Sequence, residues 1–180
     1  VAQQSFSTSS LTEADVTAIS KVQGVQASVP LMTLSGNLTP ATKTVKNYPA
    51  LATTPDFIKT ADITLDQGEF IGDVTSTTTA VVGEQLSVDL FGTDKPIGQQ
   101  FTMRGVTFTV TGVIARQDDP INFNNIDINN AVIFSLERGK LFHEGRAQIQ
   151  QIDVLTTTGA NLDDITSKIT HALVDSHGGE

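Results

Sequence analysis

The residue types that most often carry out chemistry are rare in this chain or lack a catalytic spacing. Cysteine is absent, which excludes disulfides, thiolate catalysis and cysteine-based zinc sites. His171 and His177 lie six positions apart, whereas two metal ligands on one helix face need a spacing of about three or four, and His143 is the only other histidine. Ser87 and Ser135 lack the glycine frame of a nucleophilic serine, and no Walker loop occurs. The sequence predicts no catalytic residue, no cofactor-binding residue and no metal ligand.

Acidic residues offer a second kind of chemistry, because carboxylate and amide oxygens are hard ligands of Ca²⁺. They gather in the segment DDPINFNNIDINN, from Asp118 to Asn130. The segment lacks the central glycine and the closing glutamate of an EF-hand, so an exposed polar loop is the favoured interpretation and a calcium site the alternative. Ile121 and Phe123 are its candidates for contact with a partner. The pair Asp163-Asp164 is expected at a solvated helix start, where the helix dipole favours carboxylates.

Composition limits the class of protein further. With 180 residues, of which 38% are hydrophobic, the chain is long enough for one large domain or two small subdomains. Its 20 acidic and 11 basic residues give a net charge of −9. Nucleic-acid binding needs a cationic surface that displaces counterions, and an anionic bilayer would repel this charge. We therefore expect a globular domain that binds no nucleic acid.

The sequence contains no candidate membrane span. Its longest apolar runs, such as Ala80–Val82 and Ala131–Phe134, are far shorter than the roughly 18 residues that cross a bilayer. Residues 1–10 lack the basic and apolar regions of a signal peptide. We expect an excised piece of a longer protein.

The elements at the two ends of the chain follow from their caps and apolar spacing. Thr12 and Asp15 predict a capped helix start, with the apolar stripe Val16, Ile19 and Val22. Gly24 ends that helix, and a strand begins at Val25 that Pro30 is expected to limit. An extended segment then continues to Leu38, with its partner near Tyr48–Ala52. The further elements expected are a helical turn after Pro55 that ends by Gly68, a buried strand over Ala131–Phe134, a short helix over Leu136–Phe142, a strand over Ile149–Val154 and a last helix from Leu162 to Leu173.

The middle of the chain carries a series of glycine-punctuated elements. A buried strand, Val81 and Val82, stops at Gly83, and a two-turn helix follows that ends with Leu90, Phe91 and Gly92. A turn with Pro96, Ile97, Gly98 and Gln99 comes next, because proline fixes φ and glycine accepts positive φ. A hairpin with its turn at Arg104-Gly105 then presents alternating apolar residues. The motif that these elements form comprises Val81, Val82, Gly83, Leu90, Phe91, Gly92, Pro96, Ile97, Gly98, Gln99, Gly105, Phe108, Val110, Gly112 and Val113.

This motif resembles the extracytoplasmic core domain of MacB-type ABC transporter permeases, a superfamily that includes macrolide and peptide exporters and lipoprotein-releasing permeases. The order V-V-G, helix, L-F-G, P-I-G-Q, strand and G-x-x-F-x-V-x-G-V is kept here. The resemblance extends to LTEADVTAISKVQGVQASVP near the start and to HALVDSHGGE at the end, and thus covers nearly the whole chain. Every residue of the motif also has a structural explanation in turns and core packing, so the motif indicates a fold and the function follows from family membership.

The resemblance and the order of elements predict an α/β (α+β) fold of two lobes. Both ends of the chain read as strand–helix–strand units, Phe6–Pro30 and Ile149–Val174, although the last strand of the second would fall beyond Glu180. Such a unit normally buries its helix against a sheet. We expect a porter-like βαβ lobe from residues 1–38 and 132–180, and an inserted small α/β lobe from residues 39–131. Such a division also predicts that the two chain termini lie close together on one lobe.

Two functions of different class are compatible with the sequence. In the first, which the resemblance implies, the chain is a non-catalytic domain on the extracytoplasmic or periplasmic face of the cell membrane. It couples ATP-driven motion to export, and its partners are a cytoplasmic ATPase subunit, a second permease protomer and an external adaptor or substrate. In the second, the chain is a stand-alone ligand-binding or adhesion module that uses the segment from Asp118 to Asn130 or a cleft between lobes. An apolar span of about 20 residues just before Val1 would favour the first.

Overall fold

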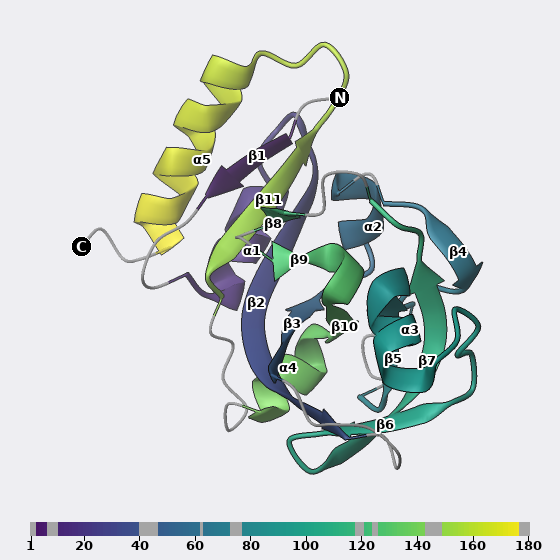
Figure 1. The fold of residues 1–180 in the computed structure, drawn as a ribbon. Coiled ribbons are helices and arrows are strands. Elements are labelled where there is room, and N and C mark those ends of the chain that lie inside the picture. The colour runs from purple at the N-terminus through teal and green to yellow at the C-terminus, as the bar shows by residue number, and fades with distance from the viewer. Residues whose placement is uncertain are drawn as a thin grey trace.

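The computed structural model describes residues 3–6, 11–39, 47–61, 63–72, 77–117, 121–123, 126–142 and 149–176. They form a mixed α/β fold in which nine strands share one sheet and two more strands pair separately (Figure 1). The helices are α1 (Glu13–Ser20), α2 (Phe57–Thr60), α3 (Glu84–Phe91), α4 (Leu136–Phe142), α5 (Leu162–Ser176) and the 3-10 helix η1 (Ile128–Asn130). The strands are β1 (Gln3–Phe6), β2 (Val25–Thr39), β3 (Asn47–Thr53), β4 (Leu65–Gly68), β5 (Thr79–Gly83), β6 (Gln100–Met103), β7 (Val106–Ile114), β8 (Ile121–Phe123), β9 (Ile126–Asp127), β10 (Val132–Ser135) and β11 (Gln151–Thr156).

The 15-residue strand β2 organises this sheet, because its pairing partner changes along its length. From Val25 to Leu31 it pairs antiparallel with β11, and from Met32 to Asn37 it pairs antiparallel with β3. Its last two residues pair with β6. Figure 1 shows β2 passing from the β1–β11 side of the molecule into the other strands without interruption. One continuous strand therefore joins both groups of strands.

The prediction that Pro30 limits this strand is wrong, because β2 continues through it. Pro30 lies opposite Ile152 of β11, and its carbonyl accepts a hydrogen bond from the Thr53 hydroxyl at 2.9 Å. The N and O atoms of one strand residue point to the same side, so the missing N–H of Pro30 faces Thr53 and not β11. The pairing of β2 with β3 begins only at Met32. Proline therefore costs β2 no ladder hydrogen bond here.

Six of the strands close into a ring of hydrogen-bonded pairs. The order is β2, β3, β10, β5, β7 and β6, and β6 pairs again with β2. The closing contact is short, with only Leu38 opposite Met103 and Thr39 opposite Thr102. The rings of Phe108 on β7 and Phe134 on β10 stack at 5.4 Å between centroids, although β5 separates the two strands. This contact places the aromatic side chains on the concave side of the ring.

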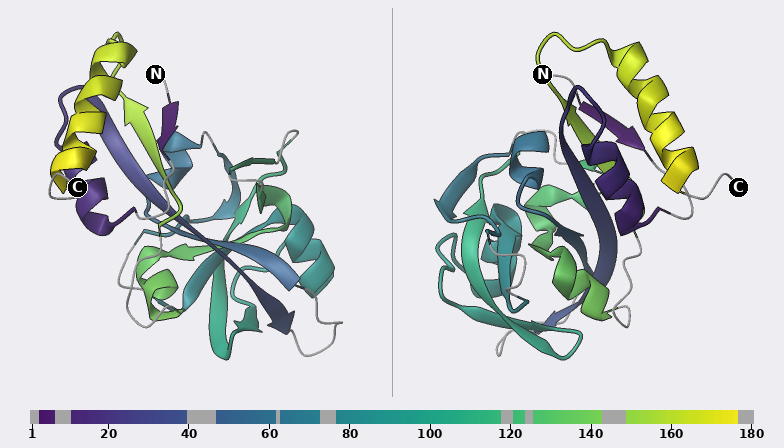
Figure 2. Two further views of the ribbon diagram at one scale, coloured as in Figure 1. Left: turned by 90° about the vertical axis from the view of Figure 1, so that its left-hand side faces the viewer. Right: turned by 180° about the vertical axis from the view of Figure 1, so that it is seen from behind.

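Helices α1 and α5 cover the other strand group. Both lie on the same face of β1, β11 and β2, as the two views of Figure 2 show. Ile19 of α1 and Ile165 and Ile169 of α5 are buried in one hydrophobic cluster with Ile152 and Val154 of β11. The apolar face predicted for the last helix is thus confirmed for Ile165, Ile169 and the partly buried Leu173, whereas Leu162 at the start of the helix is 37% exposed.

The start of α1 has the capping geometry that its sequence predicts. The Asp15 amide donates to the Thr12 hydroxyl at 3.3 Å, and the Thr12 amide donates to the Asp15 carboxylate at 2.8 Å. This reciprocal pair satisfies two backbone donors that would otherwise lack a partner in the helix. Asp15 is fully buried and Thr12 is exposed, so the capping pair is partly buried.

We expect Thr12→Ala to lower the free energy of unfolding by about 1 kcal/mol, because it removes this cap. Thr17→Ala is the matched control, since Thr17 is an exposed residue of the same helix whose hydroxyl donates only to the Glu13 carbonyl. Alanine favours helix, so that variant should be neutral or slightly stabilised. Urea titration measures both, and equal losses in the two variants would argue against the cap.

Two further predictions from the sequence are corrected by the structure. The residues Asp66, Gln67 and Gly68, expected to end a helical segment, belong to β4, which pairs antiparallel with β7. The segment expected to be an exposed polar loop up to Asn130 contains β8, β9 and η1, and Ile126, Ile128 and Asn129 are buried. Apolar residues between polar neighbours therefore fill the core here. The predicted closeness of Val1 and Glu180 falls outside the described residues.

Candidate functional site

The motif of the middle segment forms the core of the strand ring and the turns that connect it. Val82, Phe108, Val110 and Val113 are buried in the cluster on the concave side, and Val81 is buried in a second cluster on the other face of the sheet. Leu90 is buried, and the ring of Phe91 lies 6.5 Å from the ring of Phe101. These residues hold β5, α3 and β7 together.

Gly83 stands where the backbone of η1 comes closest to the start of α3. A Cβ at Gly83 would lie nearer than 3.0 Å to the carbonyl oxygens of Ile128 and Asn129. The Gly83 amide donates to the Ala131 carbonyl at 3.1 Å, so the two segments are also hydrogen-bonded. Only glycine fits at this contact, which explains the end of the V-V-G element.

Gly112 has the same function on β7. It lies opposite Gly68 of β4, and a Cβ at Gly112 would lie nearer than 3.0 Å to the Glu69 carbonyl oxygen. A Cβ at Gly68 would likewise meet the Thr111 carbonyl, and Gly68 has a φ of +70°. The two glycines therefore allow β4 to lie close to β7.

The turns of the motif have the predicted conformations. Gly92 ends α3 with a φ of +71°, and its amide donates to the Val88 carbonyl at 2.9 Å. Gly105 and the neighbouring Arg104 have positive φ values of 79° and 52°, as a tight hairpin turn requires. The Gln99 amide donates to the carbonyl of the buried Pro96 at 2.9 Å.

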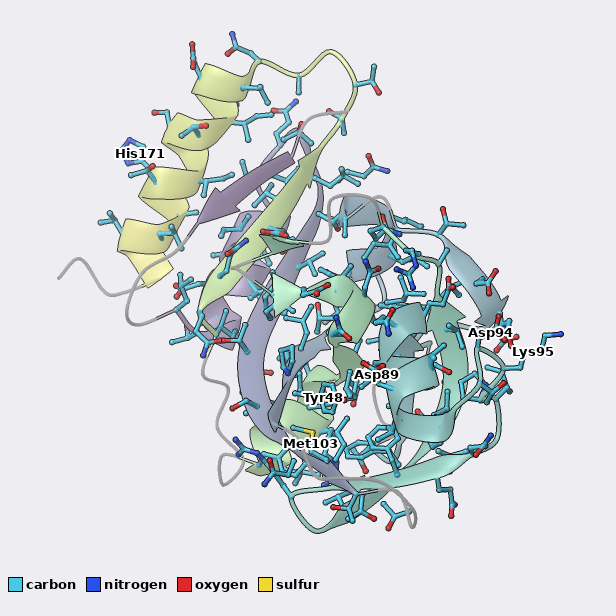
Figure 3. The ribbon with its side chains drawn as sticks, viewed as in Figure 1. Tyr48, Asp89, Asp94, Lys95, Met103 and His171 are labelled. Carbon is cyan, nitrogen blue, oxygen red and sulfur yellow. The ribbon has the colours of Figure 1, made fainter. Side chains whose placement is uncertain are left out.

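The turn from Asp94 to Gly98 also exposes an apolar side chain. Ile97 is 45% exposed beside β4, and the Gln67 amide group donates to the Asp94 carbonyl at 2.6 Å to hold the turn in place. Gly98 is fixed by its hydrogen bond to the Val110 carbonyl. Figure 3 shows Asp94 and Lys95 at the outer edge of the molecule near β4. Ile97 is thus the surface-exposed apolar member of the motif.

The acidic segment uses its polar atoms within the fold. The Asp127 carboxylate accepts from the Asn129 amide at 3.0 Å and from the Asn130 side chain at 2.9 Å. The Asn129 side chain pairs with the Gln117 backbone through both its oxygen and its nitrogen. The polar side chains of this turn therefore hydrogen-bond to groups of the same segment and to the Gln117 backbone. Asp118 and Asp119 fall outside the described residues, as do the side chains of Ile121 and Phe123, so the proposed partner contact stays a prediction.

The candidate chemical residues lie apart from one another. His171 is exposed on the outer side of α5 (Figure 3), and His143 and His177 fall outside the described residues. Asp163 and Asp164 are exposed at the start of α5, as predicted, and Asp164 forms an ion pair with Lys168 at 3.0 Å. In the described part of the chain, no three histidine, aspartate or glutamate side chains are grouped so that they could hold a metal ion. None of the helices described is long and apolar enough to cross a membrane.

The pKa values of Tyr48 and Lys140 are raised by burial or by neighbouring carboxylates. Partial burial and the Asp89 carboxylate raise the pKa of Tyr48. Figure 3 shows the two side chains facing the same space between β3 and α3. A hydrogen bond from Lys140 to Glu13 raises the pKa of Lys140. These groups stay in their usual charge states near neutral pH, which fits a structural arrangement.

Lys140 links helix α4 to helix α1 through an ion pair that the sequence did not predict. Its ammonium on α4 lies 3.1 Å from the Glu13 carboxylate on α1 and 3.5 Å from the Glu137 carboxylate. Leu141, which follows it, is 56% exposed. Gly139 on the opposite side of α4 packs against Ala52 and Met32, so α4 lies directly on β3 and β2. No local pattern links Glu13 to a residue more than 120 positions away.

A comparison with protein families identifies the fold. The family model of the MacB-like periplasmic core domain matches residues 1–172. No curated protein matches the chain.

Solved structures agree with the family. The periplasmic region of MacB from Actinobacillus actinomycetemcomitans is 18% identical, with a TM-score of 0.84, covering 98% of this chain and 84% of that one. The extracellular domain of the noncanonical ABC-type transporter YknZ from Gram-positive bacteria is 17% identical, with a TM-score of 0.78 and coverage of 99% and 96%. A domain of a putative permease protein from Porphyromonas gingivalis is 14% identical, with a TM-score of 0.68 and coverage of 95% and 72%.

Proposed function

We propose a function from one established premise: this chain belongs to the family of MacB-like periplasmic core domains, and it is an extracytoplasmic domain of an ABC transporter permease. The proposal is that the domain performs no catalysis itself. It transmits the ATP-driven motion of the cytoplasmic side to a substrate or partner outside. The useful free energy then lies in a shift of population between two states of the transporter, not in a bond made by this domain.

The continuity of β2 is the observation that carries the proposal. A domain that transmits motion must not absorb it in a flexible linker between its parts. Here a single strand passes from β11 to β3 with no break in pairing between Leu31 and Met32. The Gln150 side chain extends the ladder, because its oxygen accepts from the Thr33 amide and its nitrogen donates to the Thr33 carbonyl at 3.4 Å. Force applied at the α1–α5 end therefore reaches the strand ring through a hydrogen-bonded strand.

The division into lobes is part of the proposal. We propose a porter-like lobe that carries α1, α5, β1 and β11, and a second lobe built around the strand ring. The predicted lobes comprised residues 1–38 with 132–180, and residues 39–131. Because β10 pairs with β3 and β5, and α4 packs on β3 and β2, we propose that the second boundary follows Phe142.

The partners follow from the family and stay proposals. They are a cytoplasmic ATPase subunit or domain, a second permease protomer, and an adaptor or substrate on the extracytoplasmic face. Exposed apolar side chains on this chain, such as Ile97 and Leu141, are candidate contacts for such partners. A stand-alone adhesion module is disfavoured, because the family match covers residues 1–172 and the Asp127 carboxylate is occupied by its own turn.

The experiment that tests the proposal replaces this domain in the parent permease with a Gly/Ser linker that spans the same two ends. We expect ATP hydrolysis to continue and export to fall to background, since the domain couples motion and holds no nucleotide site. Export is measured as substrate flux from cells or proteoliposomes, and ATP hydrolysis as phosphate release. The isolated 180-residue chain is the control, and it should hydrolyse neither ATP nor peptide. Undiminished export by the linker variant, or turnover by the isolated chain, would disprove the proposal.

A further inference from the structure

Two arginine side chains from different elements converge on one aromatic ring. The guanidinium carbon of Arg104, in the turn between β6 and β7, lies 5.6 Å from the ring centre of Phe142 at the end of α4. The guanidinium carbon of Arg138 on α4 lies 5.4 Å from the same centre and 5.9 Å from the ring centre of Phe108. Cation–π contacts at these distances hold both cations in defined positions. Two preorganised positive charges thus share one end of the strand ring.

Neither guanidinium has a carboxylate partner in the part of the chain that the structure describes. Arg104 donates through Nε and Nη2 to the Ser35 carbonyl at 3.0 and 2.8 Å, and Arg138 donates through Nε to the Thr77 carbonyl at 2.5 Å. The ion pairs among these residues involve Lys140 and Lys168 only. The two terminal nitrogens of Arg138 and Nη1 of Arg104 therefore keep donors that no described acceptor uses.

Charge and burial favour an added anion at this place. Arg138 is half-buried, and this burial lowers the pKa of its guanidinium, which stays protonated at neutral pH. A partly desolvated cation that has no counter-charge among the described residues is stabilised when an anion supplies one. The two backbone carbonyls orient the arginines but bring no negative charge. In a chain of net charge −9, the pair forms a local cationic site.

We propose that Arg104, Arg138 and Phe142 form a binding site for the anionic group of a ligand, a carboxylate or a phosphate. The planar guanidinium fork matches the two oxygens of either group, and Arg138 has both terminal nitrogens available for a bidentate contact. Arg104, whose guanidinium carbon lies 5.6 Å from the centre of the same Phe142 ring, supplies the second positive charge. The site does not depend on the proposed role in transport, because it uses only residues of this chain.

The test is an NMR titration of the 180-residue chain with sodium phosphate and, separately, with sodium acetate at constant ionic strength. The signals observed are the arginine Nε–Hε groups and the Phe142 ring. We expect saturable shifts confined to Arg104, Arg138 and Phe142. The anion that gives the tighter binding identifies the class of ligand.

Three variants make the test specific. Arg138→Lys keeps the charge and most of the stem but loses the fork, and Arg104→Gln removes the second charge. Each should weaken binding by about tenfold, the size of one charged hydrogen bond. Arg116→Gln is the matched control, because Arg116 is an exposed arginine on another surface that donates to Gln85 at 2.9 Å. A response that never saturates, or one that is equal in all variants, overturns the proposal. Dispersed amide spectra confirm that each variant is folded.

Discussion

Gly83→Ala is expected to lower the free energy of unfolding by about 3 kcal/mol or more, at the upper end of the range for overpacking a tight contact. The added methyl group would meet two backbone carbonyls, those of Ile128 and Asn129, which cannot rotate away as a side chain can. Relief requires η1 to separate from the start of α3, which also strains the hydrogen bond from Gly83 to Ala131. In a protein of this size the loss corresponds to a fall in melting temperature of about 6–12 °C.

Gly92→Asn is the control for this prediction. Gly92 has a φ of +71°, yet no heavy atom lies within 4 Å of a Cβ built there. Asparagine accepts the left-handed conformation better than other residues, so the loss should stay below about 1 kcal/mol. Urea denaturation of both variants measures the contrast. If Gly83→Ala unfolds at the same urea concentration as the original chain, the close contact between η1 and β5 is not present in solution.

Local signals in the sequence predicted the helices and turns of this fold well. The cap at Thr12, the left-handed residue at Gly92 and the hairpin turn at Arg104-Gly105 all depend on residues within a few positions of each other. The partner of the long strand was also predicted correctly, since β3 covers the segment Tyr48–Ala52. Short-range backbone chemistry is readable from one sequence because the interacting groups are neighbours in it.

The closure of the strand ring, which depends on residues far apart in the sequence, could not be predicted in the same way. The pairing of β6 with β2 involves two residue pairs whose sequence carries no distinguishing pattern. Pro30 was misread because its effect depends on which side of β2 its missing N–H faces, and only the position of Thr53 decides that. Ile126 and Ile128 lie among polar residues, and their burial is decided by the contact of η1 with Gly83.

For the candidate site too, the local features could be predicted from the sequence and the long-range contacts could not. The motif from Val81 to Val113 indicated the family, because its glycines report close backbone approaches that a fold retains. The convergence of Arg104 and Arg138 on Phe142 was missed, since the three residues come from a hairpin turn and a distant helix. Chains of different fold can contain these residue types at the same spacing, so only the folded structure brings them together.

Locking the domains of two permease protomers together is expected to abolish export. These 180 residues contain no cysteine, so this domain adds no background thiol to an engineered pair. Thr17→Cys or Ser20→Cys places one thiol on the exposed face of α1, the first helix, whose predicted extent was Thr12–Val22. The second cysteine is placed in the other protomer, at a facing position with a Cα separation of roughly 4.4–6.8 Å in the dimer. A disulfide then holds the two domains in one state and removes the population shift that coupling needs.

The most direct measurement of the coupling role is therefore export by the full-length permease before and after oxidation of this cysteine pair. Single-cysteine variants control for oxidation itself, and gel mobility measures how much of the permease is cross-linked. We expect export to stop in proportion to the cross-linked fraction and to return when reductant is added. Export that continues unchanged with the cross-link fully formed would contradict it, and would show that this domain is passive during transport.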